Sequence, residues 1–281
     1  MNIIDAILNL VNNPITEIVK EYKSNNRANQ TGDALELYVR DLFAGVLCAK
    51  DEPERNLKYA EVFSYLGNNN NPPDMMLRHG DAIEVKKIAS KTSALALNSS
   101  HPKQKLKSSS NMIAAACRNA EIWTEKDMIY VVGYIKNNKL KSLCMVYGSE
   151  YCASEECYSN IKSRIKTGVL EIPGIDFSET NELGHVNRVD PPGITYLRVR
   201  GMWGIENPWK VFSYVYQEPV NSTFDFMCII PGEKYETFEN RFELEELAGD
   251  RLSIRRINVK DPVNPANLKD ARIVTFFVGN K

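Results

Sequence analysis

The sequence predicts a mixed α/β or α+β sheet domain with an extended, strand-rich C-terminal half. Three observations support this prediction. Apolar residues recur at helical spacing through the first 50 residues, and two pairs of short apolar runs around turn residues follow. From Gly193 onward, a series of apolar and β-branched runs has the length and composition of strands. This order of elements fits a sheet built together with helices.

Helices are expected where apolar residues keep a period near 3.6. The helix that begins at Thr31 has the broadest apolar face, which includes Leu35, Tyr38 and Leu42. The predicted helices cover residues 3–12, 15–23, 31–46, 112–123, 152–166 and 235–247.

Strands are expected in short apolar or alternating runs between turn residues. Two pairs of runs flank the segments Arg78-His-Gly-Asp81 and Lys136-Asn-Asn-Lys139, and we therefore expect two hairpins. Residues 50–56 are charged and contain Pro53, which predicts a loop, and the Asn-rich residues 67–73 are expected to be irregular. The predicted strands cover residues 60–66, 74–77, 82–88, 128–135, 140–147, 194–200, 210–216, 224–230, 252–259 and 272–278.

Composition excludes several classes of protein. The 281 residues include 35 Lys and Arg against 36 Asp and Glu, and 43% are hydrophobic, which excludes a disordered or collagen-like chain. The formal net charge of -1 argues against a uniformly basic nucleic-acid binder. The N-terminus lacks the features of a signal peptide, no run is long enough to span a membrane, and the six cysteines are scattered, so we expect a soluble, cytoplasmic protein without a zinc site.

One arrangement of residues suggests catalytic chemistry. Asp74 follows Pro73, and after nine intervening residues comes Glu84-Val85-Lys86. Alternate side chains of a strand share a face, so Glu84 and Lys86 should emerge together, and the hairpin should return Asp74 beside them. Two convergent carboxylates suit a hard cation such as Mg²⁺, and Lys86 would orient a water and balance the charge that develops on a phosphodiester.

This pattern is weak when taken alone. The chain contains a second copy, Asp5 followed by Glu21-Tyr-Lys23, within residues that have helical spacing. Glu84 and Lys86 would also suit the solvated face of an ordinary strand. Support comes from the next segment, because residues 86–118 carry seven basic and no acidic residues, which leaves a charge of -8 on the rest of the chain. Such a segment is either a phosphate-binding surface or a solvated loop.

Other candidate residues carry similar alternatives. Glu36 would be a third carboxylate if its helix packs against the hairpin, and otherwise an exposed helix residue. Arg198 and Arg200 share one face of a predicted strand, where they would read guanines or form surface ion pairs.

At this point the chain resembles a known family. The segment from Asn71 to Lys86 (NPPDMMLRHGDAIEVK) resembles the active-site signature of PD-(D/E)XK nucleases. The following residues 96–106 (ALNSSHPKQKL) are similar to a stretch found after that signature in certain type II restriction endonucleases. Together with residues 32–36 (GDALE) and 198–203 (RVRGMW), the resemblance is to the NgoPII-type family.

The resemblance implies a Mg²⁺-dependent homodimer that cuts the palindrome GGCC in double-stranded DNA, with a restriction-endonuclease-like core of a mixed sheet flanked by helices. Asp74, Glu84 and the Val85 carbonyl would be metal ligands, Lys86 the catalytic lysine and Glu36 a supporting carboxylate. We expect one domain, with a catalytic core in residues 1–150 and DNA recognition and a sheet extension in residues 151–281. The expected DNA-binding residues are Asn98, Ser99, Ser100, His101, Lys103, Lys105, Arg198 and Arg200.

Two alternatives remain open from the sequence. The first is a structure-specific repair or junction-resolving nuclease on the same core. The second is a non-catalytic, sequence-specific DNA-binding protein in which the Asp-Glu-Lys pattern is accidental.

Overall fold

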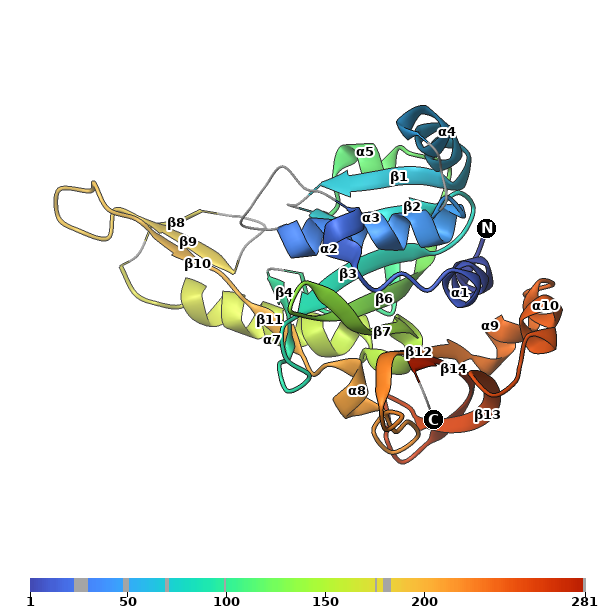
Figure 1. Ribbon diagram of the computed structural model, residues 1–281. Helices are drawn as coiled ribbons and strands as arrows, with labels where there is room; N and C mark the ends of the chain where they lie inside the picture. The colour runs from blue at the N-terminus through green and yellow to red at the C-terminus, as the bar shows by residue number, and fades with distance from the viewer. Residues whose placement is uncertain are drawn as a thin grey trace.

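The computed structural model describes residues 1–22, 30–47, 51–68, 71–98, 100–174, 176–178 and 183–279. Its centre is a nine-stranded mixed sheet in the order β1-β2-β3-β6-β7-β12-β14-β13, with β5 paired to β6 (Figure 1). The strands are β1 (Phe63–Asn68), β2 (Asn71–Leu77), β3 (Ala82–Ile88), β5 (Lys105–Lys107), β6 (Glu125–Lys136), β7 (Lys139–Tyr147), β12 (Ser222–Pro231), β13 (Leu252–Lys260) and β14 (Leu268–Gly279). Both halves of the chain therefore contribute to one sheet.

Helices cover both faces of this sheet, and one apolar core lies on each face. One core lies under α1 (Ile3–Asn12), α2 (Ile18–Glu21), α3 (Gln30–Ala44), α4 (Glu52–Val62), α9 (Gly232–Glu236) and α10 (Arg241–Glu246). The other core lies under α5 (Ala115–Arg118), α6 (Gly148–Tyr151) and α8 (Pro208–Val211). The predicted mixed sheet flanked by helices, with a strand-rich C-terminal region, is confirmed.

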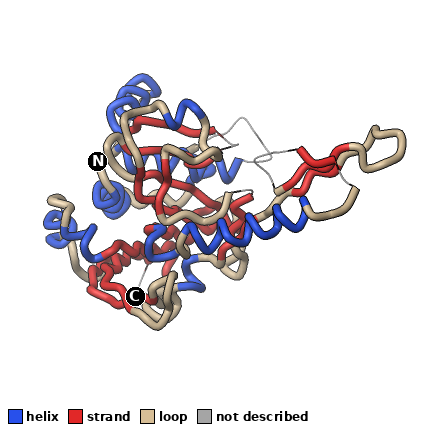
Figure 2. The backbone as a smooth tube through the Cα atoms, turned by 180° about the vertical axis from the view of Figure 1, so that it is seen from behind, coloured by secondary structure: helices blue, strands red, loops and turns tan. Residues whose placement is uncertain are grey.

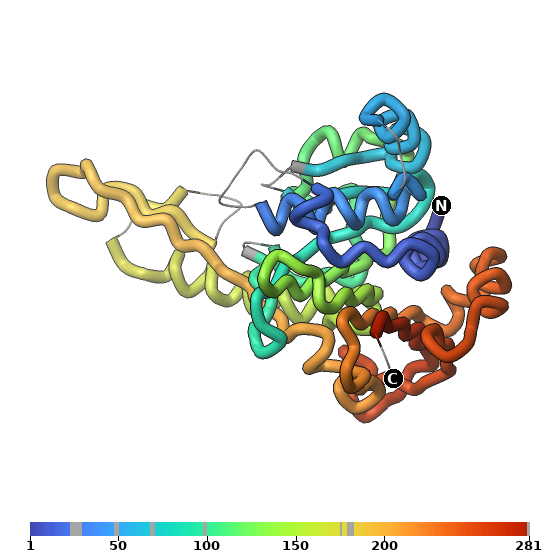
Figure 3. The backbone as a smooth tube through the Cα atoms, viewed as in Figure 1, coloured from blue at the N-terminus to red at the C-terminus, as the bar shows by residue number. Residues whose placement is uncertain are grey.

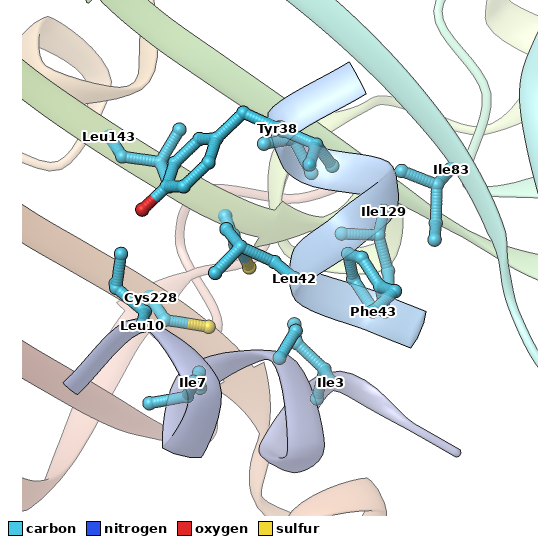
Figure 4. Packing of buried hydrophobic residues seen from close by; sticks show 14 of the residues in the cluster. Ile3, Ile7, Leu10, Tyr38, Leu42, Phe43, Ile83, Ile129, Leu143 and Cys228 are labelled. Atoms are coloured by element: carbon cyan, nitrogen blue, oxygen red, sulfur yellow. The ribbon is translucent and has the colours of Figure 1, made fainter. Parts of the chain in front are cut away.

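Helix α3 is the centre of the first core. Its residues Tyr38, Leu42 and Phe43 are fully buried between α1 and the sheet (Figure 4). The predicted apolar face of this helix is thus its packing face, and it holds the helix across β3 and β6. This packing decides where the polar residues of the same helix, Glu36 among them, meet the sheet.

Beside the main sheet, the chain forms a projecting part. Helix α7 (Glu155–Leu170) and a three-stranded sheet of β8 (Asp176–Ser178), β9 (Gly184–Asn187) and β10 (Leu197–Val199) extend away from the side that carries α1 and α10 (Figures 1 and 2). The chain then returns to the body through β11 (Trp203–Ile205), which pairs with β4 (Leu95–Asn98) (Figure 3). None of the described helices combines the length and apolar character that a membrane crossing requires.

Several predicted elements are wrong in type. The charged residues 50–56 were expected to form a loop, yet residues 52–56 begin α4, because Asp51 caps the helix by accepting from the Glu54 N–H and Pro53 occupies the first turn. Helix α4 also takes the start of the strand expected over 60–66. The strand expected over 210–216 begins as α8, which Asn207 caps through the Lys210 N–H. Local capping outweighed strand propensity in both places.

Other predictions are wrong in extent. Residues 67–73 were expected to be irregular, but β1 reaches Asn68 and β2 starts at Asn71, since the two strands pair with Asn68 opposite Asn71. The helix expected over 112–123 is limited to α5, and that over 15–23 to α2 within the described residues. The single helix expected over 235–247 is divided between α9 and α10, and only 197–199 of the strand expected over 194–200 is extended. In the remaining strands and helices the predictions agree with the structure to within a few residues.

A buried carboxylate on β12 ties several elements together. Asp225 is 1% exposed and accepts hydrogen bonds from Ser142 Oγ (2.5 Å) and Tyr216 Oη (2.9 Å). Lys91 Nζ lies 3.3 Å from its Oδ1 and 2.7 Å from Glu218 Oε2. The segment that follows β3 is thereby fastened to the opposite half of the sheet.

We predict that Asp225→Ala lowers the free energy of unfolding by about 3–5 kcal/mol, because it leaves two buried hydroxyls without their acceptor and leaves the half-buried Lys91 ammonium with only the exposed Glu218. Glu218→Ala is the matched control: this carboxylate contacts the same lysine but is 50% exposed, so its loss should cost about 1 kcal/mol or less. Urea denaturation of both variants measures the difference. Equal losses would show that the buried network does not contribute as described.

Candidate active site

The first two residues of interest come together where β2 and β3 separate. These strands pair at Met75 with Ile83 and at Met76 with Ala82, and their registered pairing extends no further. Asp74 lies just beyond the last pair, and its Oδ2 accepts a hydrogen bond from the Val85 N–H at 2.6 Å. The carboxylate thus occupies the gap between the strands and takes a donor that ladder pairing leaves available.

Glu84 and Lys86 project from β3 on one face, as strand alternation predicts. Lys86 Nζ lies 2.6 Å from Glu84 Oε1, and the two side chains are 24% and 12% exposed. The hairpin therefore brings Asp74, Glu84 and Lys86 together. Strand β1 leaves room for the backbone at Asp74 because residue 67 is a glycine. A Cβ at Gly67 would lie 2.4 Å from the Pro73 carbonyl oxygen and 3.0 Å from that of Asp74.

Glu36 approaches this group from α3. Its Oε1 forms an ion pair with Arg40 at 2.8 Å, one turn along the helix. Burial raises the pKa of Glu36, and the charges of Asp33 and Glu84 raise it further against the opposing effect of Arg40. Glu36 was expected near the site only if its helix packs against the hairpin, and α3 does pack against β3 of that hairpin.

The electrostatics of the site are dominated by carboxylates in a desolvated place. Burial raises the pKa of Asp74 well above its usual range, and the nearby charges of Glu84 and Glu36 add to the effect although Lys86 opposes it. Burial alone would lower the pKa of Lys86, but the charges of Glu84 and Asp74 outweigh burial and raise it. The lysine is therefore held in its charged form while the acids repel one another.

This donor set fits a hard divalent cation. Glu84 Oε2 is buried and has no hydrogen-bond partner among the described residues, so it is oriented as an unused acceptor. In the described part of the chain, no group of three or more His, Cys, Asp or Glu side chains is arranged to hold a metal by itself. Mg²⁺ does not require one, because it commonly binds one or two carboxylates and keeps several waters or substrate phosphates.

Only part of the basic segment, residues 86–118, offers lysines that are not already paired with carboxylates. Lys91 is bound to Asp225 and lies over the rings of Tyr134 and Trp209. Lys105 pairs with Glu125 and Lys107 with Glu155, each at 2.5 Å. Three of the seven basic residues in the run are thus paired with carboxylates from other parts of the chain, which the sequence could not show.

Lys103 differs from these neighbours. No carboxylate among the described residues lies within ion-pair distance of its ammonium, whose Nζ donates to Ser100 Oγ (2.5 Å) and the His101 carbonyl (3.1 Å). Burial lowers its pKa to about 8, against the opposing charge of Glu84. Lys103 also lines a cavity of about 620 Å³ together with His101, Lys105, Lys107 and Lys162.

A tyrosine that the sequence analysis did not single out helps to place this lysine. The Lys103 N–H donates to Tyr130 Oη at 2.7 Å, and Tyr130 stands opposite Glu84 in the parallel pairing of β3 with β6. Tyr130 therefore connects the cavity to the carboxylates. Only the pairing of two strands distant in sequence reveals this, and no local signal marks the residue.

The remaining candidates lie apart or outside the described residues. His101 stacks on Tyr158 with 5.3 Å between ring centroids, and burial and Lys103 lower its pKa to about 4, so it is neutral at physiological pH. Ser99 and the side chain of Asn98 lie outside the described residues. Arg198 lies on β10 and Arg200 just after it, in the projecting part rather than beside Asp74 (Figure 1).

The large mixed sheet with its flanking helices and strand-rich C-terminal region is consistent with a restriction-endonuclease-like fold, and the carboxylates and lysine at its diverging strands suit a nuclease. Comparison with known proteins identifies the family. Residues 1–260 match the model of the NgoPII restriction endonuclease family. The chain is also 57% identical over 277 residues to the type II restriction enzyme NgoPII of Neisseria gonorrhoeae, covering 98% of this chain and 99% of that enzyme.

The chain therefore belongs to the NgoPII restriction endonuclease family, and the predicted class of enzyme is confirmed at the level of the family. No solved structure gives a significant match to the chain.

We predict that Asp74→Asn makes the metal-free protein more stable at pH 8, by about 0.5–2 kcal/mol, because active-site charges are commonly held at a cost in stability. The sign follows from the raised pKa of Asp74: the folded state holds this proton more tightly, so its ionisation destabilises the fold as the pH rises above the ordinary value of about 4. The gain should disappear as the pH falls toward that value. Denaturation in chelator across this range is the measurement.

Glu121→Gln is the control of opposite sign. Burial would raise the pKa of Glu121, but hydrogen bonds from Lys126 and the His79 N–H lower it overall. Its charge therefore stabilises the fold above the unfolded pKa, so the variant should lose stability at pH 8 and lose less at acidic pH. A destabilised Asp74→Asn variant at pH 8 would contradict the described repulsion.

Proposed function

We propose that this protein is a Mg²⁺-dependent type II restriction endonuclease that hydrolyses both strands of duplex DNA at the palindrome GGCC, acting as a homodimer. The observation that supports it most is the convergence of Asp74, Glu84 and Lys86 at the separation of β2 and β3 in a member of a restriction endonuclease family. The choice of GGCC rests on the resemblance to the NgoPII-type family.

In this proposal Asp74, Glu84 and the Val85 carbonyl would hold the cation, and the buried Glu84 Oε2, which has no partner among the described residues, would be available to it. When bound, the cation supplies Lewis-acid polarisation of the scissile phosphodiester. Lys86, kept charged by its neighbours, orients the attacking water and stabilises the charge that develops on the phosphate. Glu36 does not need to be a ligand, since its charge reaches both acids and increases the attraction for a cation.

The DNA backbone is proposed to pass along the cavity beside Lys103. The charge of Glu84 acts on the Lys103 ammonium, which lines the cavity. Because Lys103 forms no ion pair with a described carboxylate, it can contact a phosphate without breaking one. Lys105 is the more exposed neighbour and would exchange Glu125 for phosphate. Asn98, Ser99, Ser100 and His101 would add polar contacts, and Arg198 and Arg200 would read bases from the projecting part.

The proposal is tested by digesting DNA of known sequence with the purified protein, with Mg²⁺ or with chelator, and sequencing the ends. Discrete fragments that end within GGCC, in Mg²⁺ only, are expected. Cleavage at another fixed sequence would overturn the recognition site alone, and a smear or cleavage confined to branched DNA would favour a repair or nonspecific nuclease. Bound but intact DNA in Mg²⁺ would favour the non-catalytic DNA-binding alternative.

Lys86→Ala should reduce the rate of cleavage by about 10²–10³-fold or more, because it removes the charge aligned with the transition state. Its binding to GGCC duplex in Ca²⁺ or chelator should change by less than about threefold, since one lysine is a small part of the phosphate contact. The adjacent Lys87→Ala is the matched control, because Lys87 is exposed on the other side of β3 and donates to Thr31 Oγ1 at 2.9 Å. Near-normal cleavage by Lys86→Ala would disprove the assignment.

A further inference from the structure

Tyr130 places a hydroxyl group in an apolar part of the main sheet. It is paired with Glu84 in the parallel ladder of β3 and β6, so both residues lie on the same face of the sheet. On that face Met128 and Val132, two residues before and after Tyr130, are apolar and buried, and Tyr130 itself is 3% exposed. Burying a hydroxyl costs free energy unless it forms hydrogen bonds, so this hydroxyl needs a partner.

The partner of this hydroxyl is the backbone just before β5. The Lys103 N–H donates to Tyr130 Oη at 2.7 Å. Lys103 lies outside the ladder, because β5 begins to pair with β6 at Lys105, opposite Asp127. Burial raises the pKa of Tyr130 well above its usual range, and the charge of Glu84 adds to the effect, so the hydroxyl stays neutral. A phenylalanine ring at this position would leave the Lys103 N–H without its acceptor.

The same piece of backbone is held at further points by β6 and α6. The Met128 N–H donates to the Gln104 carbonyl at 3.1 Å, and Gln104 Nε2 donates to the Cys152 carbonyl at 2.8 Å. Helix α6 begins directly against it at Gly148, where a Cβ would lie 2.3 Å from the Lys103 carbonyl oxygen. The position of the Lys103 backbone is therefore set by β6 and α6 and not by the loop that precedes it.

The fixed backbone determines where the Lys103 ammonium can lie. The side chain lines the cavity and donates to Ser100 Oγ and the His101 carbonyl, and the charge of Glu84 acts on it. The side chains of Lys105 and Lys107, which follow it, are about half exposed, and both are paired with carboxylates. An ammonium that is already held in place loses less conformational entropy when it meets a phosphate than a mobile one does.

We propose that Tyr130 is a positioning residue for DNA binding: its hydroxyl holds Lys103 where the ammonium contacts a phosphate of the bound duplex. The phosphate contact rests on the proposed function, whereas the hydrogen bond that fixes Lys103 does not. Because Tyr130 is buried, it acts on DNA only through the lysine. Removing the hydroxyl therefore weakens binding only as far as Lys103 contributes to it.

The test measures binding of a duplex that carries the cleaved sequence, in Ca²⁺ at several salt concentrations, for the wild type, Tyr130→Phe, Lys103→Met and the double variant. Lys103→Met is expected to weaken binding about 5–20-fold and to reduce the slope of log affinity against log salt by about 0.9, the value for one phosphate contact. Tyr130→Phe should weaken binding about 3–10-fold and reduce the slope in the same direction. In the double variant, Tyr130→Phe should add less than about twofold to the loss.

Tyr151→Phe is the matched control. Tyr151 is also buried, and its ring packs edge-on against that of Tyr130 with 5.7 Å between the centroids, but its hydroxyl donates to the Glu206 carbonyl. This variant also loses one buried hydrogen bond, yet its affinity and salt slope should stay within about twofold of the wild type. Circular dichroism and urea denaturation of all variants establish that the fold is retained.

An unchanged affinity and salt slope in Tyr130→Phe or in Lys103→Met would overturn the proposal. So would losses that multiply in the double variant, because Tyr130 would then act independently of Lys103. An equal loss in Tyr151→Phe would also overturn it, since the effect would then come from packing of the aromatic rings. A wild type that neither binds nor cleaves duplex DNA would contradict the proposed function itself, and the phosphate contact with it.

Discussion

The hydrogen bond from the Val85 N–H to Asp74 determines the geometry of the site. It exists because β2 and β3 pair over two residues and then separate, so the backbone of β3 has a donor that no strand satisfies. Asp74 fills that gap, and Glu84 and Lys86 flank the donor on the same strand. The carboxylates are therefore positioned by backbone geometry rather than by flexible side chains. Gly67 is part of the same constraint, since any side chain there would displace the backbone at Asp74.

This geometry places like charges together, and the surrounding structure has to hold them. Two apolar cores, one on each face of the sheet, keep β3 between helices and fix both ends of the hairpin. The Lys91–Asp225 network fastens the segment after β3 to β12, and Lys126 donates to the carbonyls of Leu77 and Gly80 in the hairpin turn. The repulsion at the site is thus held in place by packing on both faces of the sheet and by these contacts.

The sequence predicted those features that depend on local patterns. Alternation along a strand placed Glu84 and Lys86 together. The position of Glu36 stayed open in the sequence, because it depended on whether its helix packs against the hairpin. The sequence misled where a local signal supported two structures: the charges and proline of residues 51–56 are as typical of a helix start as of a loop. It was silent on Tyr130 and on the ion pair of the half-buried Lys91 with Asp225, because these depend on contacts between segments distant in the chain.

The same distinction applies to charge. In the sequence, residues 86–118 form an uninterrupted basic segment, yet in the fold Lys86, Lys91, Lys105 and Lys107 each lie against a carboxylate from the acidic remainder. The paired lysines contribute little long-range attraction, so random DNA gains little from contact with them. In the proposed binding mode, phosphates that reach Lys103 would meet an ammonium without that competition, next to the carboxylates. Charge pairing therefore favours DNA that is seated fully in the site over DNA that only touches the surface, which is the selectivity that a nuclease limited to short sites requires.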